Sequence, residues 1–220
     1  MQSPTLAYVA PFAVFIGLMA VGELVKLDPR WAYLLRSLAA FTIWLTFSRR
    51  LLTLRPKLPL ASFLVGIAVF FVWIGPDWLW PSYRRHWLFD NWLTSPGSNG
   101  LSAELKSDPW FLVTRAAGST LVVPLIEELF WRGWLLRWLA ARDFLRLPLN
   151  HYSASAFWLS ALLFAVEHGP YWDVGLAAGL AYNGWMVRTG NLGDCTLAHA
   201  VTNGCLAAYV LLAGKWQYWM

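Results

Sequence analysis

The run LPLASFLVGIAVFFVWIG, residues 58–75, contains no ionisable side chain. A helix that crosses a membrane needs about 20 mainly apolar residues, because it rises about 1.5 Å per residue across a hydrocarbon layer of about 30 Å. Inside that layer a helix also satisfies its own backbone hydrogen bonds. The run therefore predicts a transmembrane helix over residues 59–75.

The composition of the whole chain supports a membrane protein. Of its 220 residues 58% are hydrophobic and 13% are charged, whereas soluble domains carry about 25% charged residues. The 16 tryptophans and 8 tyrosines suit the two interfaces of a bilayer. The net charge of +5 is spread over loops between apolar runs, which favours contact with anionic lipid headgroups and no nucleic-acid partner.

The fold class that follows is all-α, a polytopic transmembrane bundle of about seven spans. We expect one integral membrane domain over 1–220, with three framing spans in 1–75, a loop or lid in 76–108 and a motif-bearing core in 109–214. The N-terminal run lacks the basic region and cleavage site of a signal peptide, so it is interpreted as a retained span. The expected spans are 5–26, 31–48, 59–75, 110–136, 149–168, 172–189 and 193–214.

The orientation follows from the basic loops. The segment SRRLLTLRPK, residues 48–57, has four basic residues, and the positive-inside rule places it in the cytoplasm. The segment RWLAARDFLRLP, residues 137–148, falls on the same side. We expect a bacterial inner membrane protein with a cytoplasmic N-terminus and an external C-terminus.

Nearly all the ionisable residues inside the spans lie in the last four of them. Such residues cost several kcal/mol in hydrocarbon, about 3 kcal/mol on insertion scales, and usually mark a functional site. Three pairs have a spacing of four residues, which places both members on one helix face. The pairs are Glu128 with Arg132, Phe164 with His168, and His199 with Asn203.

These spacings predict a division of roles. Glu128 pairs with Arg132, whereas the adjacent Glu127 projects about 100° away and has no local cation. Glu127 is then a candidate general base for water, with His168 sharing the proton. His199 and Asn203 would donate hydrogen bonds to a developing oxyanion. This chemistry is the hydrolysis of an amide.

The three motifs, EELFWR at 127–132, FAVEH at 164–168 and HAVTN at 199–203, resemble those of the type II CAAX prenyl protease family and its bacteriocin-processing relatives. The resemblance covers about 110–214. It implies an intramembrane glutamate endopeptidase without a cofactor, in which Glu127 and His168 activate water, His199 and Asn203 form the oxyanion hole, and Glu128 and Arg132 support them. The length and tryptophan content are similar to a bacterial subgroup found with exosortase sorting systems.

The sequence leaves the substrate open. The family name implies substrates with prenylated C-termini, but no residue in this sequence indicates a binding site for a prenyl group. The expected partners are membrane lipids and a protein or peptide substrate, with C-terminal processing, sorting signals and leader peptides all open.

Other functions remain as alternatives. Two histidines and a carboxylate can also bind a zinc ion and leave its fourth coordination position free for water. A silent relative would act as an immunity or partner-binding protein, and intramembrane acids and histidines also serve transporters. A cysteine nucleophile at Cys195 is disfavoured, because apolar surroundings keep a thiol protonated.

Two structural expectations accompany the site. Gly175, Gly179 and Gly184 should permit close helix contact. His168 ends its span near the external side, so the span 149–168 must tilt or stop at mid-membrane for His168 to meet Glu127. Gly169-Pro170 would allow such a break.

Overall fold

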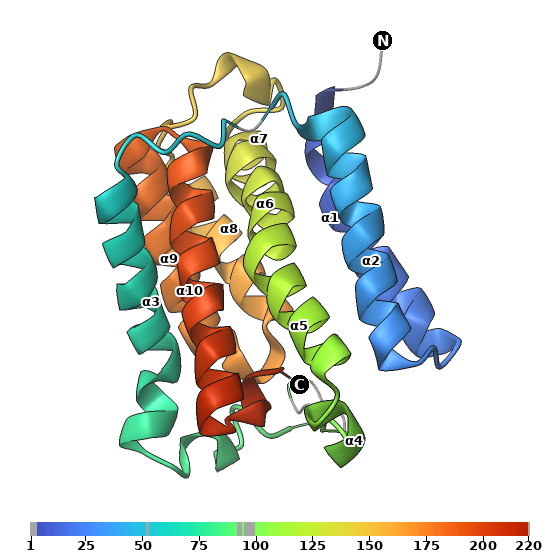
Figure 1. Cartoon of the computed structure of the whole chain (residues 1–220). Helices are drawn as coiled ribbons and strands as arrows, with labels where there is room; N and C mark the ends of the chain where they lie inside the picture. Colours follow the sequence, from blue (N-terminus) through green and yellow to red (C-terminus); the bar gives the residue numbers. More distant parts are fainter. Residues whose placement is uncertain (1–3, 52, 92–93, 95–99, 220) are drawn as a thin grey trace.

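The computed structural model describes residues 4–51, 53–91, 94 and 100–219, and within these residues every regular element is helical. All seven expected helical segments form. Figure 1 shows them as one bundle in which consecutive helices run up and down. The segments are α1 (Pro4–Leu24), α2 (Pro29–Ile43), α3 (Pro59–Leu79), Pro109–Ala140, α8 (Ala154–Glu167), α9 (Trp172–Thr189) and α10 (Leu192–Ala213).

The segment Pro109–Ala140 is one continuous helix with two wide turns. Its α-helical parts are α5 (Pro109–Ala117), α6 (Val123–Glu128) and α7 (Leu136–Ala140). The parts between them, Gly118–Val122 and Leu129–Leu135, are π-helical. Such insertions often occur at functional sites, and here they flank the two glutamates.

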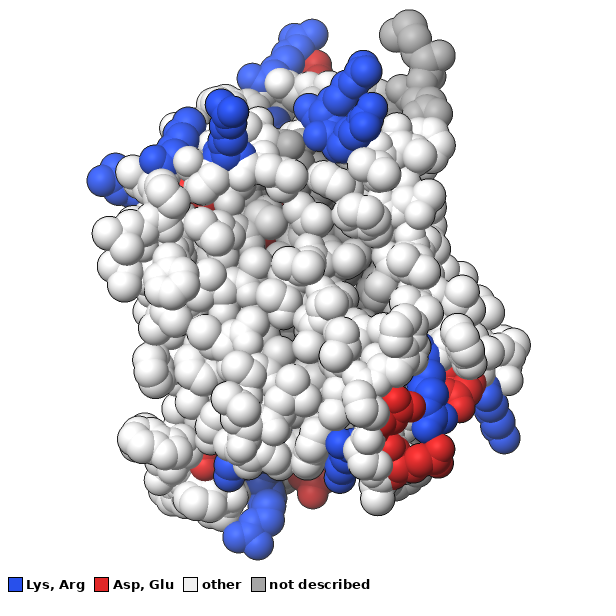
Figure 2. All heavy atoms as spheres, in the orientation of Figure 1, with Lys and Arg blue, Asp and Glu red and all other residues white. Residues whose placement is uncertain are grey.

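Four of the segments are long and apolar enough to cross a membrane: α1, α3, Pro109–Ala140 and α10. Figure 2 shows the corresponding surface, where charged side chains gather at the two ends and the middle of the visible face is almost free of them. The all-α membrane bundle is thereby confirmed. Both basic loops, 48–57 and 137–148, lie at the same end of the bundle, the upper end in Figure 1.

The expected span 149–168 is wrong at its beginning. Residues 148–153 form a turn, in which the His151 amide donates to the Pro148 carbonyl oxygen, and α8 starts only at Ala154. Its 14 residues give a length of about 21 Å, less than the hydrocarbon thickness of about 30 Å. The helix is therefore shorter than the span expected from the sequence, and it ends at Glu167, directly before His168.

The loop also begins later than expected, because α3 continues through Pro76 to Leu79. After it come a 3-10 turn at Tyr83–Arg85 and the four-residue α4 (Ala103–Lys106). Arg84 attaches this loop to the core through ion pairs with Asp77 and Asp173. The Trp172 indole also donates to the Leu88 carbonyl oxygen at 3.2 Å. The described part of the loop thus packs on the α8–α9 connection.

Asp194, fully buried at the start of α10, fixes this helix against α3. Its carboxylate accepts hydrogen bonds from the backbone amides of Lys57 and Leu58, both at 2.9 Å, and from the Ser62 hydroxyl at 2.8 Å. One side chain therefore caps the N-terminus of a neighbouring helix. Further along, Gly66 allows the close crossing, since a Cβ atom there would lie 2.7 Å from that of Val201.

The glycines of α9 have two different roles. A Cβ atom at Gly175 would lie 3.2 Å from the His168 Cβ, and one at Gly179 would lie 3.2 Å from the Ala161 Cα. Both glycines therefore permit the close contact of α8 with α9, as expected. Gly184 faces open space, and the prediction for that residue is wrong.

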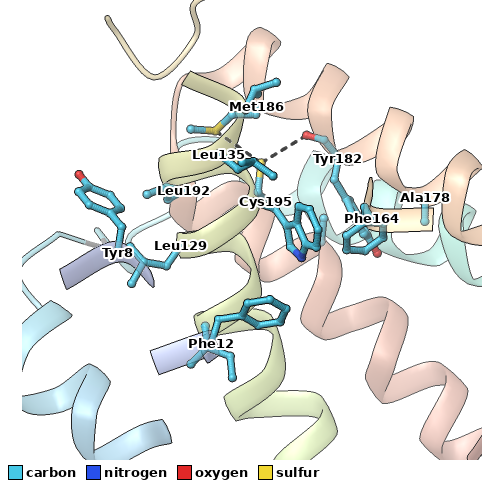
Figure 3. Close-up of a cluster of buried hydrophobic side chains, with 14 of the residues drawn as sticks. Tyr8, Phe12, Leu129, Leu135, Phe164, Ala178, Tyr182, Met186, Leu192 and Cys195 are labelled. Atoms are coloured by element: carbon cyan, nitrogen blue, oxygen red, sulfur yellow. Dashed lines mark hydrogen bonds between the residues drawn. The ribbon is translucent and has the colours of Figure 1, made fainter. Parts of the chain in front are cut away.

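One apolar cluster joins all seven helical segments and includes Tyr8, Phe12, Leu129, Phe164 and Met186. Figure 3 shows that the cluster packs directly around the motif-bearing helix. Cys195 belongs to this cluster and contacts the Tyr182 carbonyl oxygen and the Met186 sulfur. The site is therefore held by a continuous core that also includes the framing helices.

Candidate active site

Glu127 and Glu128 are the last two residues of α6, and both are buried. They have different surroundings, as their angular separation predicts. Glu127 lines a cavity of about 290 Å³, and its Oε2 atom is buried without a hydrogen-bond partner. A buried carboxylate oxygen that lacks a donor is costly unless water or a ligand supplies one.

Glu128 is fully enclosed and holds two motifs together. Its Oε1 accepts hydrogen bonds from Arg132 Nη1 at 3.0 Å and from His199 Nδ1 at 2.8 Å, whereas its Oε2, like that of Glu127, is buried without a partner. The i,i+4 ion pair with Arg132 was expected from the spacing. The bond to His199 was missed, because spacing along one helix cannot reveal a contact with another.

Arg132 is a second buried anchor. Its guanidinium donates to the Asn183 side-chain oxygen at 3.1 Å and to the Gly179 carbonyl oxygen at 3.4 Å, and it lies 4.5 Å from the centre of the Phe164 ring. Asn183 was not identified as a site residue. A polar amide in the apolar run VGLAAGLAYNGW was the available signal, since such residues usually bond to another helix.

His168 lies at the C-terminus of α8, and its ring orientation is fixed. Its Nδ1 atom is 2.7 Å from the Phe164 carbonyl oxygen. Because a carbonyl oxygen only accepts, Nδ1 carries the proton, and Nε2 of the neutral ring has a free lone pair. The ring also packs against Trp73, with a centroid separation of 5.1 Å. Phe164, expected to pack, does so and is almost fully buried.

Asn203 lies one turn beyond His199 on α10. Its Nδ2 atom donates to the Ser119 carbonyl oxygen at 2.9 Å. An amide nitrogen has two hydrogens, so one remains for a second acceptor. Ser119 belongs to the π-helical turn Gly118–Val122, and this contact therefore joins α10 to the helix that carries the glutamates.

The cavity brings these residues together. Glu127, His168, His199 and Asn203, from three different helical segments, all line it. Glu167 lines it as well, close enough to Glu127 for their charges to interact, and the sequence left its role undecided. Cys195 does not line the cavity and is fully buried in the apolar core.

No three His, Cys, Asp or Glu side chains in the described part of the chain are grouped as a metal-binding site. Two of the candidate ligands also have other partners, because Glu128 is bonded to Arg132 and to His199.

Comparison with known proteins finds a family match in the motif-bearing region. Residues 109–205, a little under half of the chain, match the family described as type II CAAX prenyl endopeptidase Rce1-like. Searches of curated proteins and of solved structures found no match. The matched region contains the three motifs and therefore Glu127, His168, His199 and Asn203, whereas α1, α2 and α3 also contribute residues to the cavity lining. This chain is therefore a helical membrane protein whose residues 109–205 match the type II CAAX prenyl endopeptidase Rce1-like family.

Proposed function

We propose that the chain is an intramembrane endopeptidase that hydrolyses a peptide bond near the membrane surface, with water activated by Glu127 and His168. The single observation that carries this proposal is the cavity shared by the family's acid, imidazoles and amide, with an unpartnered oxygen of Glu127 inside it. The family match of residues 109–205 supports a membrane protease of this class.

Glu127 and His168 would act together on one water molecule. A water in the cavity would donate one hydrogen bond to the Glu127 carboxylate and the other to Nε2 of His168, whose lone pair the Phe164 carbonyl oxygen keeps available. The water oxygen attacks the carbonyl carbon and its proton passes to Glu127. The protonated Glu127 then transfers that proton to the leaving nitrogen as the C–N bond breaks.

The oxyanion would be held by His199 and Asn203. Glu128 Oε1 already accepts a hydrogen bond from Arg132, so His199 Nδ1 is taken to donate to the same oxygen. Nε2 of His199 can then donate only when the ring is an imidazolium, a charge that Glu128 stabilises. The second Nδ2 hydrogen of Asn203 supplies the other hydrogen bond.

The orientation and the partners are part of the proposal. The end of the bundle with both basic loops faces the cytoplasm of a bacterial inner membrane, and the lipid contacts are made by the apolar outer faces. The substrate is a protein or peptide presented at the membrane. The loop that packs on the α8–α9 connection beside His168 would act as a lid.

The test is comparative mass spectrometry of membranes that contain the wild-type chain or its Glu127→Gln variant. We expect one or more cleavages to disappear in the variant. Unchanged cleavage patterns, or an immunity phenotype that survives the substitution, would show a non-enzymatic protein instead. Loss of cleavage on treatment with a zinc chelator, restored by zinc, would favour the zinc alternative.

The control is Glu23→Gln, because this exposed glutamate on α1 does not line the catalytic cavity. Both variants remove one carboxylate and retain its shape. Only Glu127→Gln should abolish cleavage.

A further inference from the structure

Two arginines without an acid partner lie at the far end of the catalytic cavity. Arg36 comes from α2 and Arg115 from α5, and both line the cavity that contains Glu127. They also line a second cavity of about 220 Å³ that runs toward the α1–α2 turn. The two guanidinium groups therefore lie between the proposed catalytic site and a second cavity.

Neither arginine forms an ion pair with any residue that the structure describes. The Nε atoms of both are buried without a hydrogen-bond partner. The charges of Arg36 and Arg115 repel each other, Glu23 attracts Arg36 only through space, and Lys26 adds another positive charge at the second cavity. The second cavity is lined by three basic side chains and one acid, Glu23. This excess of positive charge favours the binding of an anion.

Both cations contact the aromatic ring of Tyr33. The guanidinium carbons of Arg36 and Arg115 lie 4.7 and 4.5 Å from the centre of this ring. One oxygen acceptor already lies there, since Arg115 Nη2 donates to the Trp219 carbonyl oxygen at 3.2 Å. The remaining donors of this pair suit the two oxygens of a carboxylate.

We infer that Arg36 and Arg115 bind a carboxylate of the peptide substrate and thereby select which bond is cut. This inference rests on the proposed proteolytic function. Arg115 precedes Glu127 on the same continuous helix by about 18 Å, at about 1.5 Å per residue. An extended peptide covers that distance with about five residues, so the carboxylate lies within about five residues of the cleaved bond.

The first test measures binding without cleavage. Glu127→Gln protein in phosphatidylcholine nanodiscs is equilibrated with a mixture of apolar hexapeptides, supplied as free acids or as C-terminal amides. A third set consists of C-terminal amides that each contain one glutamate, placed at a different position in each peptide. Bound peptides are quantified by mass spectrometry.

We expect free acids, or amides with glutamate at one position, to bind about 10- to 100-fold more tightly than plain amides. Whichever set is preferred identifies the source of the carboxylate. In an added Arg36→Gln/Arg115→Gln background this preference should disappear while plain amides bind as before. Equal binding of all three sets, or a preference that persists without the arginines, overturns the inference.

Unchanged binding of plain amides also shows that the double variant is folded. Arg36→Lys/Arg115→Lys keeps the charge but loses the planar fork, and should retain part of the preference. Arg146→Gln is the matched control, because its side chain is 86% exposed in a loop at the opposite end. It should leave the preference unchanged.

Two further outcomes are informative. If phosphatidylglycerol in the nanodiscs raises the unfolding temperature through the arginines and peptides show no preference, the site holds a lipid phosphate and the inference is wrong. If the preference is present but Glu127→Gln removes no cleavage from membranes, the carboxylate site stands and the proteolytic function fails. If Glu127→Gln removes cleavage from membranes but all three peptide sets bind equally, the proteolytic function is supported and the inference about the carboxylate is wrong.

Discussion

His199 Nδ1 lies 2.8 Å from Glu128 Oε1, so the acid that pairs with Arg132 also orients the histidine of another motif. Glu127, its neighbour in sequence, forms no ion pair with any residue that the structure describes, and it faces the cavity. Two adjacent glutamates therefore have separate structural positions, one inside a charge network and one exposed to the cavity. This separation leads to different predictions for their substitution.

Glu128→Gln should destabilise the fold and Glu127→Gln should not. Removing the Glu128 charge leaves Arg132 buried without its counter-ion, at a cost of about 3 kcal/mol. Removing an unpaired buried charge at Glu127 should leave stability unchanged or increase it slightly. Thermal unfolding in detergent, followed by circular dichroism, compares the two variants. Equal unfolding temperatures would contradict the network.

Asn203→Ala should lower kcat by about 100- to 1,000-fold, the usual loss for one oxyanion donor, with little change in KM. The measurement is a titration with a peptide identified from the membrane comparison. The unfolding temperature of the variant serves as the control for folding. A large rise in KM with an unchanged kcat would show that Asn203 binds substrate instead.

Gly66→Ala should destabilise the bundle by about 1–3 kcal/mol, because the new Cβ atom overpacks the crossing of α3 and α10. The control is Gly17→Ala in the interior of α1, where nothing lies within 4 Å of a new Cβ atom. That variant should gain about 0.5–1 kcal/mol from the lower backbone entropy of alanine. The prediction is wrong if both substitutions move the unfolding temperature in the same direction.

Acid should weaken the link between the framing helices and the motif-bearing helix. Asp108 caps α5 and accepts a hydrogen bond from Arg30 Nε at 2.5 Å. The bond to Arg30 holds the pKa of the Asp108 carboxyl below its ordinary value of 3.8, and hydrogen bonds from the backbone act in the same direction. A lowered folded-state pKa gives stability that is present above the ordinary value and is lost as the pH falls through the folded-state value.

The measurement is the unfolding temperature between about pH 2 and pH 6, for the wild type and for Asp108→Asn. Asparagine caps a helix as well as aspartate does. The variant should therefore keep the helix cap and lose only the part of the stability that depends on acid. Asp143→Asn removes the acid of an exposed pair and is the control. Identical pH profiles for the wild type and Asp108→Asn would contradict the role of this ion pair.

The sequence predicted the elements well because membrane helices are encoded locally. A run such as 59–75 needs no knowledge of its neighbours, and α9 has the expected bounds. The error at α8 also has a local cause, since the turn at 148–153 contains no residue that forbids a helix except Pro148. The break after His168 was visible from Gly169-Pro170.

For the site, the sequence by itself determined the residue types, the order of the motifs and the pairing of Glu128 with Arg132, because an i,i+4 contact follows from the geometry of one helix. The tertiary structure decided which residues share a cavity, that Glu128 reaches His199, that Asp194 caps α3 and that Arg36 lies with Arg115. Each of these is a contact between helices, and it depends on crossing angle, depth and rotation. Those quantities are set by the packing of the whole bundle, so no single span of the sequence contains them.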